Sequence, residues 1–316
     1  MPATAILQTA APPLSVLSME TFGEHEVANG PLRGTLALPR GRTQAPLALI
    51  LAGSGPMDRD GNLPQARNDS LKLLAHGLAA RGIATLRIDK RGVAASAAGA
   101  PREAELRFDT YVDDALSWLK LLTAQARAAG LSPAPVFLIG HSEGALVATL
   151  AAQRRTVDGL ILIAGAGQPA CAIIARQLAD AGVSETLRTR SGGICAALEQ
   201  GQPAADVPPE LLALYRSGIQ PYLMSWLPLD PASALAKVPA PTLVVQGTSD
   251  LQVSLADAER LAAARPGTRL VSISGMNHVL KTAPTERDKN LATYMNPALP
   301  LAPALIPALA DFISTR

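Results

Sequence analysis

One short segment has the residue types and spacing of a serine nucleophile. It reads Gly-His-Ser-Glu-Gly at 140–144, after an apolar run at 136–139 and before a stretch at 145–153 with apolar residues at helical spacing. A serine on a sharp turn between strand and helix exposes its hydroxyl, and the flanking glycines let neighbouring backbone approach without a Cβ clash. The segment predicts Ser142 as a nucleophile.

A serine hydroxyl is a weak nucleophile at neutral pH and needs a histidine base that a carboxylate orients. The chain has four histidines. His141 adjoins Ser142 on the turn, where we expect its side chain to point elsewhere. His25 falls in a predicted hairpin and His76 in a predicted helix. This leaves His278, in a glycine-containing loop after the last predicted strand, as the general base.

The carboxylate is expected between serine and histidine, at the end of a strand. Asp250 fits, because it closes a buried-type strand and turn at 242–250. Asp257 and Glu259 fall on a helical pattern, and the other candidate acids fall within 167–238. Asp250 is therefore the predicted third member, although an aspartate there is also suited to cap the next helix.

Two backbone N–H groups are expected to stabilise the negative oxygen that forms when the serine attacks a carbonyl. One belongs to Glu143, the residue after the nucleophile. The second is assigned to Ser54, with Gly55 as the next choice, because Gly53 and Gly55 lack side chains and let the backbone approach closely after the strand at 47–52. These glycines would equally suit a tight turn. Both glycines are also predicted to contact substrate.

Alternating strand and helix patterns must position these residues. Buried strands are predicted at 47–52, 84–88, 136–139, 160–163, 242–245 and 270–273, and covering helices at 70–81, 111–129, 145–153, 255–264 and 303–313. Segments 21–27 and 32–38 flank an Asn-Gly-Pro turn and predict an edge hairpin. The pattern favours an α/β fold with a mostly parallel sheet covered on both faces.

The interval 167–238 has helical patterns punctuated by prolines and no strand-like run. We interpret it as a helical cap, or lid, inserted into a core formed by 1–166 and 239–316. Its apolar residues, Trp226 among them, would suit a pocket wall and would equally suit packing onto the sheet. Trp226 and His141 complete the residues predicted to bind substrate.

Composition excludes several functional classes. The chain has 316 residues, of which 48% are hydrophobic, with a net charge of +2. The charges are interspersed, so nucleic acid and membrane surfaces are not expected as partners. No metal-ligand motif or phosphate-binding loop occurs, so no metal and no cofactor are expected. The sequence does not indicate an oligomeric state.

Cysteine usage and the N-terminal segment bear on the cellular compartment. The chain has two cysteines, Cys171 and Cys195. We expect them to stay unpaired, with a bond between them left open. Residues 1–19 lack the charged start of a signal peptide, and the first basic residue is Arg33. A cytoplasmic location is therefore expected.

The motifs together resemble the α/β-hydrolase superfamily, over nearly the whole chain. Beyond the serine segment, the runs at 52–62, 89–92 (Asp-Lys-Arg-Gly), 246–250 and 275–278 are similar to a serine aminopeptidase-like branch with many carboxylesterases. The resemblance implies an eight-stranded sheet and a triad of Ser142, Asp250 and His278. One departure is Ala52, where many relatives have histidine. Arg59 and its neighbouring aspartates are predicted to form an ion-paired structural knot, with a position in the pocket as the alternative.

The sequence thus predicts a serine hydrolase that cleaves carboxylic esters through an acyl-enzyme, with a small-molecule ester as its substrate; the acyl-chain preference is left open. An aminopeptidase or amidase of the same fold is the first alternative, although no convincing pair of acids is available to hold a free amino terminus. A binding protein that keeps the fold without catalysis is the second alternative, and the complete triad disfavours it.

Overall fold

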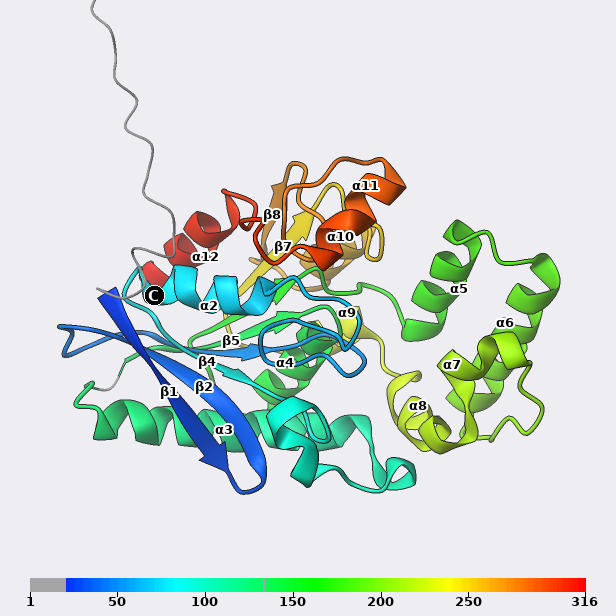
Figure 1. The fold of residues 1–316 in the computed structure, drawn as a ribbon, viewed down its shortest axis with the longest axis horizontal. Helices are drawn as coiled ribbons and strands as arrows, with labels where there is room; N and C mark the ends of the chain where they lie inside the picture. The colour runs from blue at the N-terminus through cyan, green and yellow to red at the C-terminus, as the bar shows by residue number, and fades with distance from the viewer. Residues whose placement is uncertain (1–20, 133) are drawn as a thin grey trace, which may run out of the picture.

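The computed structural model describes residues 21–132 and 134–316, which form an eight-stranded sheet with helices on both faces (Figure 1). The expectation about a signal peptide concerns residues 1–19, outside this part of the chain. The strands are β1 (Phe22–Asn29), β2 (Leu32–Pro39), β3 (Leu47–Leu51), β4 (Ala84–Ile88), β5 (Val136–His141), β6 (Gly159–Ile163), β7 (Thr242–Gly247) and β8 (Arg269–Ile273).

The strand order is β1-β2-β4-β3-β5-β6-β7-β8. β1 and β2 form the predicted antiparallel hairpin, β2 pairs antiparallel with β4, and every later pairing is parallel. The prediction of a mostly parallel eight-stranded sheet is confirmed. In such a sheet the carboxyl ends of the parallel strands meet at one edge, where the loops that follow them converge.

Strand side chains alternate between the two faces of the sheet and feed two hydrophobic cores. In β3, Leu47, Leu49 and Leu51 pack into one core, while Ala48 and Ile50 pack into the other. Because β3 and β6 are covered on both sides, their sequences are continuous apolar runs rather than alternating ones.

The helices are α2 (Ser70–Ala79), α3 (Phe108–Ala128), α4 (Glu143–Arg154), α5 (Ala170–Asp180), α6 (Glu185–Glu199), α7 (Leu212–Tyr215), α8 (Gln220–Trp226), α9 (Pro231–Leu235), α10 (Leu255–Ala264), α11 (Arg287–Ala292) and α12 (Leu305–Ser314). α2 and α12 cover one face of the sheet, and α3, α4 and α10 cover the other. α5 to α8 project beyond the carboxyl edge (Figure 1), while α9 packs on α4 and α10.

The two cysteines are bonded, so the expectation that they stay unpaired is wrong. Cys171 and Cys195 form a disulfide with their Cα atoms 5.9 Å apart. α5 and α6 are consecutive helices in contact, and the bond joins the beginning of α5 to the end of α6. An antiparallel helical hairpin brings these two positions side by side. Disulfides are rare in the cytosol, so the bond weighs against the expected cytoplasmic location.

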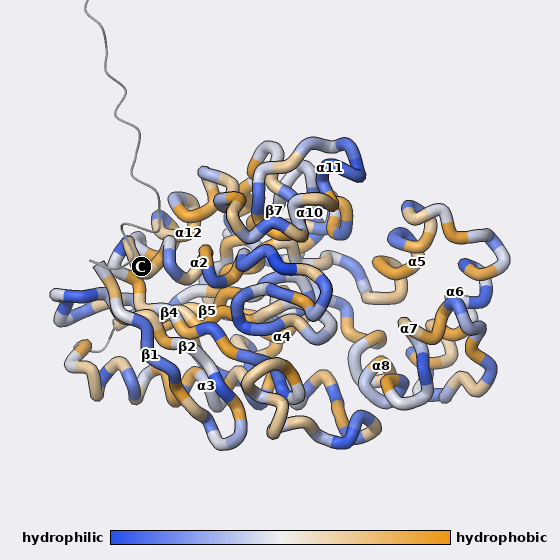
Figure 2. The backbone as a smooth tube through the Cα atoms, viewed as in Figure 1, coloured by the Kyte–Doolittle hydropathy of each residue, from blue (hydrophilic) through white to orange (hydrophobic). Residues whose placement is uncertain are grey.

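Hydropathy distinguishes the strands from the loop that follows β3. Figure 2 shows the segment between β3 and α2 as a hydrophilic stretch beside apolar strands. Within the described part of the chain, no helix has the length and apolar character needed to cross a bilayer.

Candidate active site

Ser142 lies on the turn between β5 and α4, with a backbone φ of 54° and ψ of −122°. This conformation is strained for a residue with a Cβ, at a cost on the order of 1–3 kcal/mol. The N–H of Ser142 donates to the carbonyl oxygen of Ile163 at 2.9 Å. A Cβ on Gly140 or Gly144 would lie closer than 3.0 Å to the backbone of adjacent segments. The predicted strand, turn and helix at this serine are confirmed.

The structure places His278 and Asp250 in direct contact. Nδ1 of His278 lies 2.9 Å from Oδ2 of Asp250, and the side chains are 5% and 0% exposed. Oδ1 accepts the backbone N–H groups of Gln252 (2.8 Å) and Val253 (3.0 Å), and the amide of Gln246 donates to Oδ2 at 3.1 Å. Burial raises the pKa of the Asp250 carboxyl, but His278 and these backbone donors outweigh it, so the pKa lies below its ordinary value. The carboxylate favours a proton on Nδ1 and leaves Nε2 able to accept one.

His141 supports the backbone of His278. Nε2 of His141 lies 2.9 Å from the carbonyl oxygen of His278 and donates to it, and the two ring centroids are 4.9 Å apart. Burial, with a smaller contribution from His278, lowers the pKa of His141 to about 3, so the ring is neutral at physiological pH. The ring also borders a cavity beside His278. Its predicted contact with substrate stays a prediction.

The topology explains how residues far apart in sequence meet. Ser54 follows β3, Ser142 follows β5, Asp250 follows β7 and His278 follows β8. These strands are parallel, so the four residues emerge at the same edge of the sheet.

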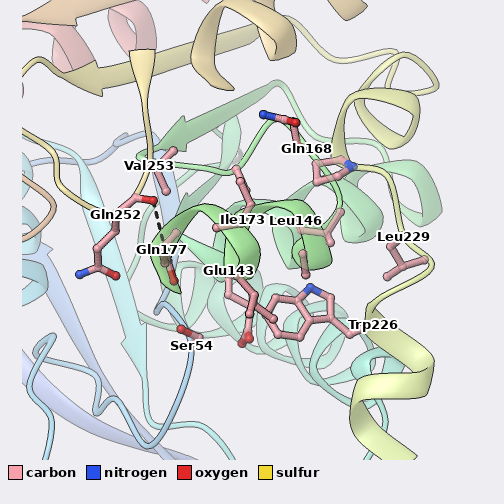
Figure 3. Close-up of a pocket in the computed structure, with 15 residues that line it drawn as sticks. Ser54, Glu143, Leu146, Gln168, Ile173, Gln177, Trp226, Leu229, Gln252 and Val253 are labelled. Atoms are coloured by element: carbon pink, nitrogen blue, oxygen red, sulfur yellow. Dashed lines mark hydrogen bonds between the residues drawn. The ribbon is translucent and has the colours of Figure 1, made fainter. Parts of the chain in front are cut away.

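A first cavity, of about 120 Å³, opens between Ser142 and the helical insertion. Figure 3 shows Ile173 and Gln177 of α5 on one side of this space, with Trp226 of α8 and Leu146 of α4 on another. Trp226 thus lies on the wall of a pocket beside Ser142, and its predicted contact with substrate stays a prediction. Its ring also stacks on Phe108 at a centroid distance of 6.2 Å, so the wall and packing interpretations both apply.

A second cavity, also of about 120 Å³, lies on the His278 side of Ser142. Ser54 and Ser142 border both cavities, whereas His278 borders only the second. Met57, Leu63 and Tyr294 add largely apolar surface to it.

The two N–H groups predicted to bind an oxyanion, those of Ser54 and Glu143, have no hydrogen-bond acceptor within the described residues. Gly53 lies directly against the serine, because a Cβ at Gly53 would be 3.1 Å from the Cβ of Ser142. Gly55 instead borders a separate space next to Tyr222. The substrate contacts predicted for the two glycines stay predictions.

Three residues of the site were not selected from the sequence. Gln177 donates to the carbonyl oxygen of Gln252 at 3.2 Å, and both border the first cavity. Lys90 extends from the loop after β4 to the carbonyl oxygen of Gly53 at 2.5 Å. The sequence signal that could have selected Lys90 is its position in the Asp-Lys-Arg-Gly run directly after a predicted strand.

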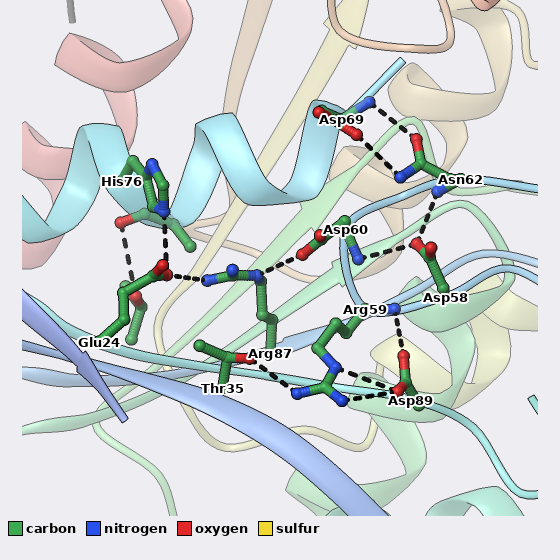
Figure 4. A network of polar contacts seen from close by, with 12 residues as sticks. Glu24, Thr35, Asp58, Arg59, Asp60, Asn62, Asp69, His76, Arg87 and Asp89 are labelled. Carbon is green, nitrogen blue, oxygen red and sulfur yellow. Dashed lines mark hydrogen bonds and ion pairs between the residues drawn. The ribbon is translucent and has the colours of Figure 1, made fainter. Parts of the chain in front are cut away.

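The charged loop after β3 forms an ion-paired network (Figure 4). Arg59 pairs with Asp89 at 2.9 Å and with Glu26 at 2.7 Å, and Arg87 pairs with Asp60 at 2.7 Å. The prediction that Arg59 belongs to a structural knot is confirmed. The knot ties this loop to β1 and to the loop after β4, and thereby fixes the approach to Ser54.

Comparison with known proteins places the chain in a family. Residues 48–293 match the model of the alpha/beta hydrolase family, so the chain belongs to that family. It is similar to Esterase EstD of Thermotoga maritima, with 26% identity over 282 residues. That alignment covers 84% of this chain, and the chain spans 63% of the relative's length.

Solved structures share the fold. Est1E from Butyrivibrio proteoclasticus, in a structure with bound ferulic acid, superposes with a TM-score of 0.56 at 15% identity, covering 92% of this chain and 100% of that one. A dienelactone hydrolase from Anabaena variabilis superposes with a TM-score of 0.52 at 21% identity, covering 94% and 99% of the two chains. These likenesses confirm the α/β-hydrolase fold.

Proposed function

We propose that this protein hydrolyses carboxylic esters through an acyl-enzyme. Ser142 attacks the ester carbonyl while Nε2 of His278 takes its proton and then returns it to the departing alcohol. Asp250 holds the imidazole tautomer and stabilises the imidazolium, and water then repeats the sequence on the acyl-enzyme. The observation that carries the proposal is the buried 2.9 Å contact between His278 and Asp250, at the edge of a cavity that Ser142 also borders.

The two unpaired N–H groups supply the electrostatic part of the mechanism. The tetrahedral intermediate places a negative oxygen between the N–H groups of Ser54 and Glu143. Removing one such donor typically costs about 10²- to 10³-fold in kcat. The positive end of the α4 dipole lies at Glu143 and adds to this stabilisation.

The positions of the two cavities assign the two halves of the substrate. His278 must protonate the leaving oxygen, so the alcohol occupies the second cavity, which His278 borders. The acyl group then occupies the first cavity, against Ile173 and Trp226. Both spaces are small and largely apolar, which favours a small ester with apolar groups on both sides. In this assignment the insertion at 167–238 acts as a cap over the acyl group.

An ester is favoured over a peptide amine as substrate. An aminopeptidase needs an acidic group to hold a free amino terminus. Among the described residues that line the two cavities, Glu143 is the one acid, and Lys90 neutralises it at 3.8 Å. The name of the related esterase agrees with this choice. Faster turnover of an aminoacyl anilide than of a short acyl ester would reverse it.

Replacement of the nucleophile tests the proposal. Ser142→Ala should abolish turnover of p-nitrophenyl acetate and covalent labelling by a fluorophosphonate probe. Ser117→Ala, at an exposed position on α3, is the matched control and should retain both. If Ser142→Ala retains both properties, the proposed function is wrong.

A further inference from the structure

Lys90 is a buried cation in contact with Gly53 and Glu143, beside the site, and the proposed mechanism gives it no role. Its side chain is 9% exposed, although it carries an ammonium group. Burial lowers the pKa of Lys90 from its ordinary value, and the nearby carboxylate of Glu143 opposes that shift. A buried ammonium is costly unless it is paired and hydrogen-bonded, so its contacts indicate what it does.

The first contact fixes a peptide plane. Nζ of Lys90 donates to the carbonyl oxygen of Gly53 at 2.5 Å. That carbonyl and the N–H of Ser54 belong to one planar trans peptide, in which they point in opposite directions. An ammonium that holds the carbonyl oxygen on one side therefore directs the Ser54 N–H to the other side. Without the ammonium, the Gly53–Ser54 peptide is free to rotate, and the Ser54 N–H then no longer points at the oxyanion.

The second contact involves the residue that supplies the other donor. Nζ of Lys90 lies 3.8 Å from Oε1 of Glu143, whose side chain is 5% exposed. Left unpaired, this carboxylate would place a buried negative charge beside the oxygen that becomes negative during catalysis. Lys90 thus contacts the residues on both sides of the proposed oxyanion site and offsets the charge of Glu143.

Neighbouring ion pairs hold the Lys90 loop rigid. Arg91 forms two hydrogen bonds of 2.6 Å with Asp114, and Asp89 binds the Arg59 side chain. The Tyr111 ring lies under the ammonium at 5.5 Å. Every charged residue of the Asp-Lys-Arg-Gly run thus has a fixed partner, and Lys90 is the one that reaches the site.

Resting on the proposed function, we infer that Lys90 is a positioning residue that orients the Gly53–Ser54 peptide and so aims the Ser54 N–H at the oxyanion. Lys90→Met keeps the length of the side chain and removes the ammonium. The expected result is a fall in kcat of about 10²-fold, with KM changed less than threefold, because the donor acts in the transition state. Lys120→Met, on the exposed face of α3, is the matched control and should behave as wild type.

Binding of phenylboronic acid, which forms a tetrahedral adduct with an active-site serine, separates positioning from general stability. Its Kd should rise in Lys90→Met by about the same factor as kcat falls, which a purely structural role would not produce. Because Lys90→Met leaves the Glu143 carboxylate without its cation, the double variant K90M/E143Q removes both charges and should fold. Its kcat should also stay about 10²-fold below wild type, since the Gly53 carbonyl still lacks its donor.

Fluorophosphonate labelling of Ser142 distinguishes a failure of this inference from a failure of the proposed function. If the wild-type protein is not labelled at Ser142, both fail. If it is labelled and folded Lys90→Met keeps kcat within fivefold of wild type, the inference alone is overturned. Recovery of wild-type kcat in K90M/E143Q would also overturn it, because Lys90 would then only neutralise Glu143.

Discussion

Asp250→Asn tests the proposed hydrogen-bond chain with the smallest change in shape. The Asp250 carboxylate accepts from four donors, namely Nδ1 of His278, the amide of Gln246 and the backbone N–H groups of Gln252 and Val253. Asparagine has one acceptor oxygen and one NH₂ group, so it cannot satisfy all four. With its oxygen on the two backbone donors, its NH₂ group faces Nδ1 of His278. The imidazole must then carry its proton on Nε2, where it cannot accept the proton of a serine.

The magnitude follows from the loss of the correct tautomer. This change typically lowers kcat by about 10³- to 10⁴-fold, equivalent to about 4–5.5 kcal/mol of transition-state stabilisation. Substrate contacts are untouched, so KM should change less than threefold. Mispairing of the buried amide with the Gln246 donor should also lower the free energy of unfolding by about 1–3 kcal/mol.

Steady-state turnover of p-nitrophenyl acetate at pH 7 and unfolding in urea measure the two effects. Asp311→Asn is a suitable control, because Asp311 lies in an exposed ion pair with Arg269. It should change kcat less than twofold. If Asp250→Asn folds and keeps kcat within tenfold of wild type, the assignment of Asp250 as the partner that orients His278 is refuted.

Three further predictions concern the cap, the disulfide and a buried histidine. Trp226→Ala should enlarge the acyl cavity and shift the preferred p-nitrophenyl ester to longer acyl chains. The kcat/KM should rise about fourfold for each extra buried methylene. An unchanged chain-length profile would contradict the pocket role of Trp226. The double variant C171S/C195S removes a bond between residues with a sequence separation of 24 and should lower the free energy of unfolding, measured in urea, by about 3 kcal/mol. An unchanged midpoint of urea unfolding would contradict a stabilising disulfide. His141 has a pKa of about 3 in the folded protein against an ordinary 6.5, so its contribution to stability is complete above pH 6.5 and is lost as pH falls toward 3, by up to about 1.4 kcal/mol per pH unit. Thermal unfolding at pH 7 and pH 5 should therefore show a smaller acid destabilisation in His141→Gln than in wild type, and equal destabilisation would refute this account.

Much of the core was predictable because its signals are local. The strand pattern of β4 and the helical periodicity of α10 gave bounds that agree with the structure. Where bounds differ, a local contact explains the difference. α3 begins at Phe108, three residues before the predicted start, because the Thr110 hydroxyl accepts the backbone N–H of Arg107 at 3.3 Å and caps the first turn.

The pairing of Cys171 with Cys195 was not predicted, although they are the two cysteines of the sequence. A disulfide requires Cα atoms within about 7 Å. The distance between the two cysteines depends on whether α5 and α6 turn back on each other, and the apolar pattern of each helix fits several arrangements. Packing of the two helices decided that question.

The sequence by itself determined the alternation of strands and helices, the turn that carries Ser142, and the choice of Asp250 and His278, because each depends on residue type and on neighbours in the chain. Only the tertiary structure decided that Lys90 reaches Gly53, that Trp226 borders a cavity, and that Asp89 and Glu26 are the partners of Arg59. These contacts depend on the directions of side chains from segments far apart in sequence. Such directions are set by packing over the whole sheet, which no local pattern encodes.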